Sequence, residues 1–340
     1  METLWFCLVA AMVALYVILD GFDLGTGIVH LFVARSDRER RQVIGAIGSV
    51  WDGNEVWLLA AGGTLYFAFP TLYASSFSGF YLPLMMVLWL LILRGLSVEL
   101  RSHVDNALWK AFWDAAFALG SILLTIFFGA ALGNVVRGVP LNQAGYFFLP
   151  LWTNFMPGRD SGILDWYTVS IGIAAAFTLT MHGALWVALK TDGAVHQRAK
   201  RVARRMWWVV ASLTVLITVL SFQVQPHLFE NFAAQPWGYV FPLVALAGLI
   251  GVRLSQRELI AFLSSAAYIG GMLTSAAFGV YPYVLASNGD ASAGLTIYNS
   301  SAARYGLDIG LRWFIPGMLL ATGYFFFVYR HFAGKVKLTS

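Results

Sequence analysis

Long apolar stretches alternate with short polar connections along the chain, and this pattern predicts an all-α membrane protein. Crossing a hydrocarbon core of about 30 Å takes roughly 20 apolar residues in a helix. Stretches of this kind lie near residues 4–33, 44–69, 76–97, 113–136, 166–189, 207–224, 237–253, 258–283 and 311–331. We therefore predict a polytopic protein with nine transmembrane helices in a single membrane domain (1–340), arranged as two four-helix bundles plus one peripheral helix.

The ends of these stretches carry further expectations. The first is longer than a simple span, so we expect it to tilt or to end in a turn at the interface. The connection from Pro70 to Ser75 is short and uncharged, as in a tight hairpin. The N-terminal run has neither a basic segment before it nor a small-residue cleavage site after it, which predicts an uncleaved first span and not a signal peptide.

Composition supports this reading. Of the 340 residues, 59% are hydrophobic and 11% are charged, and the mean hydropathy is +0.70. Soluble domains carry about 25% charged residues, so these values exclude an ordinary water-soluble globule. The single cysteine, Cys7, lies in the first apolar run, which excludes a disulfide framework and a thiolate metal site within this sequence.

Lysine and arginine predict the orientation. Eighteen of the 22 fall at one side of the predicted topology, among them Arg94, Arg101, Lys335 and Lys337. The four on the other side are Arg137, Arg159, Arg304 and Arg312. By the positive-inside rule the first group is cytoplasmic, so the N-terminus lies outside, the C-terminus lies inside, and the two longer connections are external. The net charge of +5 follows from this topology, and no nucleic-acid partner is needed to explain it.

Carboxylates inside the first two spans are the leading functional candidates. Asp20 and Asp23 lie in the first span, and Asp52 and Glu55 lie in the second. Each pair is three residues apart and therefore shares one helix face. A carboxylate at the bilayer centre costs about 2.5 to 3.5 kcal/mol on insertion scales, so such residues usually mark a proton or ion path.

The predicted topology places these acids, with Asp114 at the start of the fourth span, toward the cytoplasmic side. We expect a wet, acidic inlet there, with Asp52 as the strongest relay candidate. The alternative is that the acids pair with Arg94 and Arg101 and serve only to hold helices together. That alternative is preferred for Glu99, which closes the third span, and it stays open for Asp114.

Other residue types are read as structural. His182 is the only histidine deep in a span, and a chain with several haems would need more axial ligands, so we expect His182 to hydrogen-bond between helices. Trp51 and Trp57 flank the acids of the second span, and they either pack in the core or face a partner subunit. The glycines of the first two spans are expected to let helices approach closely. They are Gly21, Gly25, Gly27, Gly53, Gly62 and Gly63.

Six short motifs resemble subunit II of cytochrome bd quinol oxidases, including the cyanide-insensitive branch. The most specific is Val-Trp-Asp-Gly-Asn-Glu-Val-Trp-Leu (50–58). The others are Leu-Asp-Gly-Phe-Asp-Leu-Gly (19–25), Ser-Gly-Phe-Tyr-Leu-Pro-Leu (78–84), Leu-Arg-Gly-Leu-Ser-Val-Glu-Leu-Arg (93–101), Tyr-Pro-Tyr-Val-Leu (281–285) and Leu-Thr-Ile-Tyr-Asn-Ser-Ser-Ala (295–302). They extend from the first span to the last loop, so the resemblance covers essentially the whole chain.

The resemblance implies a heterodimer in a prokaryotic cell membrane, with possible small single-span accessory subunits. Subunit I would carry haem b, haem d and the quinol site and reduce oxygen to water. Subunit II would hold no haem, stabilise its partner and contribute acids to a cytoplasmic proton path. By motif these acids are Asp52, Asp23 and Asp114. Glu55 departs from the family pattern, because other members carry Gln there, so its charge is not expected to be essential.

Two alternatives remain open at this stage. A stand-alone proton-coupled transporter would also have intramembrane acids and glycine-rich helices, although the sequence lacks a pair of broken helices in matching halves. A purely structural anchor would use the acids only for packing. Replacing Asp with Asn separates the relay from the anchor, because turnover falls in the first case and assembly fails in the second.

Overall fold

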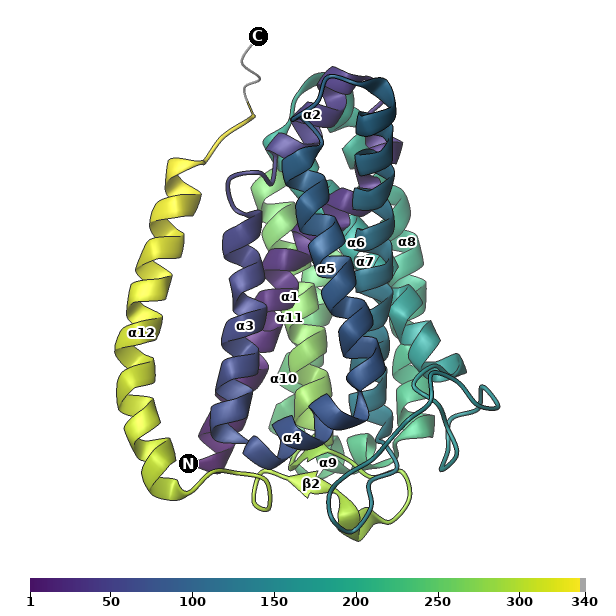
Figure 1. Cartoon of the computed structure of the whole chain (residues 1–340), viewed down its shortest axis with the longest axis vertical. Coiled ribbons are helices and arrows are strands. Elements are labelled where there is room, and N and C mark those ends of the chain that lie inside the picture. Colours follow the sequence, from purple (N-terminus) through teal and green to yellow (C-terminus); the bar gives the residue numbers. More distant parts are fainter. Residues whose placement is uncertain (337–340) are drawn as a thin grey trace.

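The computed structural model describes residues 1–336, which are mainly helical (Figure 1). Lys337 lies outside the described residues. The α-helices are α1 (Glu2–Val33), α2 (Asp37–Gly45), α3 (Trp51–Ala68), α4 (Pro70–Gly79), α5 (Tyr81–Leu100), α6 (Ala107–Arg137), α7 (Trp166–Lys190), α8 (Gly193–Val224), α9 (His227–Ala234), α10 (Val240–Leu254), α11 (Glu258–Val280) and α12 (Arg304–His331). The remaining elements are the 3-10 helices η1 (Pro236–Tyr239) and η2 (Ala291–Ala293) and the antiparallel strands β1 (Tyr283–Leu285) and β2 (Leu295–Thr296).

Within residues 1–336 eight helices are long and apolar enough to cross a membrane, as expected of a multi-pass membrane protein. They are α1, α5, α6, α7, α8, α10 together with η1, α11 and α12. The other predicted span corresponds to α3, which runs beside the bundle in Figure 1 but begins with the polar residues Asp52, Asn54 and Glu55. Because these residues lower its hydropathy, α3 is not among the eight, and the count of nine stays a prediction.

One predicted span and one predicted connection are wrong. The stretch 44–69 is not one helix, because the chain leaves α2 at Gly45 and starts α3 at Trp51, and the weak helix former Gly48 lies in the turn between them. The expected hairpin at 70–75 is instead the start of α4, where Pro70 occupies the first helical turn. Proline is well suited to that position because its missing N–H has no partner there in any case.

Helix α1 lies at the centre of the bundle and packs on α3, α6, α7 and α11. The closest approach is between Gly25 and Gly183 of α7, where a side chain on either residue would overlap the other helix. The predicted packing role is therefore confirmed for the glycines of α1, which are Gly21, Gly25 and Gly27. A Cβ added to Gly62 or Gly63 of α3 would meet no other atom of the described chain within 4 Å, so the packing role of these two glycines stays a prediction.

Helix α12 is the peripheral helix. It stands apart from the other helices in Figure 1, and Leu307 is its only buried residue. The rest divides into α1, α3, α5 and α6 on one side and α7, α8, α10 and α11 on the other. These groups share a core, because α1 and α6 both pack on α7. The N-terminus and the end of α12 lie at opposite ends of the bundle (Figure 1).

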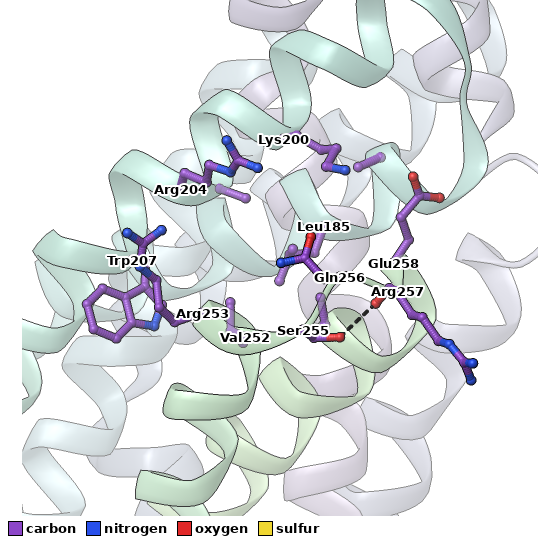
Figure 2. A pocket seen from close by; sticks show the side chains of 13 residues that line it. Leu185, Lys200, Arg204, Trp207, Val252, Arg253, Ser255, Gln256, Arg257 and Glu258 are labelled. Carbon is purple, nitrogen blue, oxygen red and sulfur yellow. Dashed lines mark hydrogen bonds between the residues drawn. The ribbon is translucent and has the colours of Figure 1, made fainter.

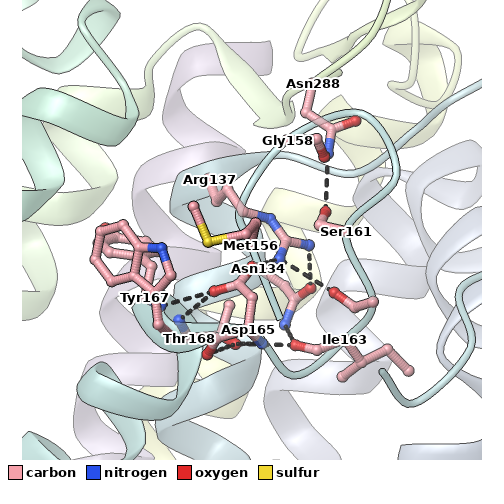
Figure 3. A network of polar contacts seen from close by, with 12 residues as sticks. Asn134, Arg137, Met156, Gly158, Ser161, Ile163, Asp165, Tyr167, Thr168 and Asn288 are labelled. Atoms are coloured by element: carbon pink, nitrogen blue, oxygen red, sulfur yellow. Dashed lines mark hydrogen bonds and ion pairs between the residues drawn. The ribbon is translucent and has the colours of Figure 1, made fainter. Parts of the chain in front are cut away.

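A buried polar network holds the long connection 138–165 (Figure 3), which lies at the end of the bundle opposite to α2 (Figure 1). Arg137 at the end of α6 pairs with Asp165 and donates to the side-chain oxygen of Asn134 at 2.7 Å. The other carboxylate oxygen of Asp165 accepts from the backbone N–H groups of Tyr167 and Thr168, which caps α7. The network therefore ties the connection to both helices that flank it.

Candidate functional site

Four buried polar side chains form a stripe along α1. Tyr16, Asp20, Asp23 and His30 are separated by four, three and seven residues, so they share one helix face. At 1.5 Å per residue the stripe is about 21 Å long. All four side chains are buried, and three of them bind partners from other helices, so the stripe defines a continuous candidate site.

Around Asp20 the site is an ion cluster. Arg94 of α5 donates to Asp20 at 2.5 Å and to Glu55 of α3 at 2.7 Å. Arg94 and Asp20 are fully buried, whereas Glu55 is partly exposed. The sequence placed Arg94 among the cytoplasmic loop cations, and this is wrong, because Arg94 lies inside the bundle. Its pairing with Asp20 is the contact that the structural-anchor alternative predicted.

Around Asp23 the partners are neutral. The side-chain amide of Asn54 donates to Asp23 at 2.7 Å, and the hydroxyl of Tyr329 on α12 donates to the Asn54 carbonyl oxygen at 2.7 Å. Within residues 1–336 Asp23 has no salt bridge, and its second carboxylate oxygen has no hydrogen-bond partner. Asp23 is therefore a buried acid that no cation neutralises within the described chain.

Around Asp114 the site is a dense charged cluster at the α2 end. The Asp114 carboxylate lies 2.6 Å from Nε2 of His30. It also accepts hydrogen bonds from Arg101 at 2.5 Å and from Arg40 of α2 at 2.6 Å. Arg101 also reaches Asp37 of α2 at 2.9 Å. Two guanidinium groups favour the ionised form of Asp114, so the arrangement is typical of an anchor that fixes α2 over the bundle.

Asp52 lies apart from these clusters. Its side chain is exposed on the outer face of α3, next to the exposed Val56 and Leu59, while Asn54 of the same turn points inward. Among the described residues Asp52 makes no hydrogen bond or ion pair, so the structure does not bring it into contact with Asp23 or Asp114 as the sequence predicted. Asp52 therefore lies on the surface of the chain, Glu55 is partly exposed, and Asp20, Asp23 and Asp114 are buried.

Residues 1–332 match the family described as "Cytochrome bd terminal oxidase subunit II". The chain belongs to this family. As such it is a subunit of a bd-type quinol oxidase, an oxidoreductase complex, and the family implies a subunit I partner.

Relatives and a solved structure agree with this family. The chain is 29% identical to "Probable cytochrome oxidase subunit 2" of Haemophilus influenzae, over 98% of this chain and 94% of that protein. It is 27% identical to "Cytochrome bd-I ubiquinol oxidase subunit 2" of Escherichia coli K12, over 94% and 92%. The bd oxidase structure from Geobacillus thermodenitrificans superposes with a TM-score of 0.76 at 18% identity, covering 97% of this chain and 98% of that one. This last match shows that the fold is shared.

His182 of this bd-family chain has the structural role that the sequence predicts. Its Nδ1 lies 2.6 Å from the hydroxyl of Ser265, and its Nε2 lies 3.0 Å from the carbonyl oxygen of Ile18. Both ring nitrogens are therefore engaged by α11 and α1. Within residues 1–336 no group of three or more His, Cys, Asp or Glu side chains is arranged to hold a metal ion.

Sequence reasoning missed several members of the site. Tyr16 and His30 could have been found, because their spacing from Asp20 and Asp23 continues one helix face. Asn54 lies inside the second-span motif but was not considered as the partner of Asp23. Arg40 and Tyr329 carry no sequence signal, since their contacts join segments far apart in the chain.

Proposed function

We propose that this chain is the haem-free subunit of its oxidase and supplies part of the proton path. In this proposal subunit I carries haem b, haem d and the quinol site. The observation that carries the proton-path proposal is the environment of Asp23. A buried carboxyl group without a counter-ion favours its neutral form, so Asp23 can take up and release a proton without breaking an ion pair.

The hydrogen-bonded neighbours of Asp23 fit this role. An amide cannot readily carry a proton, so Asn54 orients the carboxyl group and leaves its other oxygen to exchange the proton. Tyr329 holds Asn54 in place from α12. The two successive hydrogen bonds from Tyr329 to Asn54 and from Asn54 to Asp23 therefore position one exchangeable carboxyl oxygen inside the bundle.

The ion cluster of Asp20, Glu55 and Arg94 can also take up a proton. When Asp20 and Glu55 are both ionised, they carry two negative charges against the single positive charge of Arg94. A proton that reaches this cluster neutralises the excess charge. Asp114 has a different role in the proposal: its arginine partners hold it ionised, and it positions α2 at the entrance.

Asp52 would connect the path to subunit I. The exposed face of α3 that carries Asp52, Val56 and Leu59 is apolar apart from this carboxylate. We place this face against subunit I, so that Asp52 passes protons across the interface. Four protons from the cytoplasm and four electrons from quinol convert one oxygen molecule to two waters. If quinol releases its protons outside, the reaction builds a membrane potential.

The first test is Asp52→Asn in the assembled complex. Turnover in quinol-driven oxygen uptake should fall on the order of 10²-fold, the low end of what a positioned acid–base group contributes. Haem content, read from the reduced-minus-oxidised spectrum, should stay the same. Asp105→Asn is the matched control, because Asp105 is an exposed acid that pairs only with Lys110.

Each outcome separates the alternatives. Lost turnover with intact haem and an unaffected control supports the relay. Failure of the complex to assemble supports the structural anchor. Unaltered turnover with Asp52→Asn refutes the relay role of Asp52.

A further inference from the structure

A cavity of about 170 Å³ lies between α8 and the turn that joins α10 to α11, and no residue of the α1 stripe lines it (Figure 2). One wall is the first part of α8, and the opposite wall is the turn between α10 and α11. Its floor is apolar and includes Leu185 of α7 and Val252 of α10. The polar side chains that line it are Lys200, Arg204, Arg253, Ser255, Gln256, Arg257 and Glu258.

The charge of this cavity is positive and is not balanced within the described chain. Lys200 and Arg204 stand on its α8 side in Figure 2, and neither forms a salt bridge with any residue of 1–336. Among the described residues that line the cavity, Glu258 is the only acid. Its two carboxylate oxygens are already engaged, by Lys335 at 2.9 Å and by His196 at 3.2 Å. The cavity is therefore suited to an anion.

Tryptophans place the cavity at the level of lipid headgroups. Trp207 donates its indole N–H to the carbonyl oxygen of Leu249 at 2.7 Å. The Arg253 guanidinium lies 5.9 Å from the Trp207 ring and 5.7 Å from the Trp208 ring. Tryptophan concentrates at membrane–water interfaces, and stacking holds Arg253 in place without neutralising it. A third cation is thus positioned beside the first two.

Helices α8 and α10, which both line the cavity, pack only weakly on each other. Helix α8 packs mainly on α7 and α10 mainly on α11. On the bilayer side they carry the exposed apolar residues Val215, Leu216, Leu246 and Ile250. The basic cavity therefore joins an apolar surface, as expected of a site for a molecule with an anionic head and hydrocarbon chains.

We propose that this cavity binds the phosphate of an anionic phospholipid headgroup, with the acyl chains on the exposed faces of α8 and α10. Guanidinium groups bind phosphate oxygens through paired N–H donors, which Arg204 and Arg253 supply. Lys200 adds a point charge. Gln256 and Ser255 on the opposite wall contact the polar part of the headgroup. Basic pockets between transmembrane helices bind anionic headgroups by the same chemistry.

The test uses the purified two-subunit complex in detergent, incubated with phosphatidylglycerol or with zwitterionic phosphatidylcholine. Native mass spectrometry then counts the lipid retained. The pocket variant is Lys200→Gln with Arg204→Gln. The control is Arg201→Gln with Arg205→Gln, which removes the same charge from the same turns of α8 at exposed residues that do not line the cavity.

At about fivefold per cation near the membrane surface, the pocket variant should bind phosphatidylglycerol roughly 25-fold more weakly than the control does. Equal retention by the two variants would mean general attraction to a basic surface and would overturn the proposal. So would equal retention of the zwitterionic lipid by the unaltered complex. If the double variants assemble poorly, Arg204→Gln against Arg205→Gln gives the same comparison with about a fivefold difference.

Inorganic phosphate distinguishes the two sources of this anion. If the site is built for a lipid, millimolar phosphate should leave the bound phosphatidylglycerol in place, because it lacks the acyl chains. Displacement of the lipid by phosphate would show a site for a free anion and would overturn the lipid assignment.

Discussion

Arg94 offers the sharpest test of what the buried charges contribute to stability. Replacing it with Met keeps much of the side-chain volume but removes the only cation that binds Asp20 within the described chain. Asp20 is fully buried, so its charge would be left without compensation. Breaking a buried ion pair on one side costs about 3 to 5 kcal/mol. Glu55 adds little, because it is partly exposed and water can solvate it.

A double-mutant cycle separates this cost from lost packing. Arg94→Met alone should destabilise the assembled complex by about 3 to 5 kcal/mol, and adding Asp20→Asn should recover most of that loss because no buried charge is then left unpaired. The assay is the loss of haem absorbance with temperature and denaturant for the four complexes of the cycle. Two results would refute the reasoning: an Arg94→Met complex as stable as the unaltered one, or a double variant no more stable than the single one.

Three further changes test the packing and the charges around the site. Gly25→Ala should destabilise the complex by at least about 1 to 3 kcal/mol in the same melting assay, because its methyl group would overlap the backbone of α7. Asp165→Asn leaves Arg137 buried without its partner, so protease cleavage within 138–165 should become faster. The Arg198 guanidinium, 2.6 Å from the Glu39 carboxylate, lowers the pKa of Glu39 below its ordinary value of 4.5, so the pair stabilises above that pH and its contribution is lost as the pH falls below it. The melting difference between the unaltered protein and Glu39→Gln should therefore shrink from pH 6 to pH 4.

Hydropathy predicted most of the fold, because a helix in lipid must be apolar over the full bilayer thickness. It failed where a helix starts with polar residues. The break before Trp51 was hidden inside one apolar-looking stretch, and α4 was taken for a hairpin because its ten residues are too few to span a bilayer. The first turns of α8 were missed for a similar reason, since their cations lie outside the hydrocarbon.

The candidate site was predicted in its residue types but not in its contacts. Helical spacing placed Asp20 and Asp23 on one face, and both turned out to be buried. Spacing also placed Asp52 on the same face as Glu55. In the structure no other helix of the described chain covers the side of α3 that carries Asp52, and helical spacing alone does not reveal this. Asp23 has a neutral partner, Asn54, whereas Asp114 has a cationic partner, Arg101. These partners come from distant segments, which no single-chain pattern connects.

The central claim is that protons reach the oxygen-reducing haem through the buried acids of this chain, with Asp23 as the carrier. The most direct measurement is the rate of proton uptake, followed with a pH-indicator dye, when the fully reduced complex reacts with oxygen. We predict that Asp23→Asn slows this uptake on the order of 10²-fold while the haem spectrum is unchanged. Proton uptake at the rate of the unaltered complex, with the same haem content, would contradict the account.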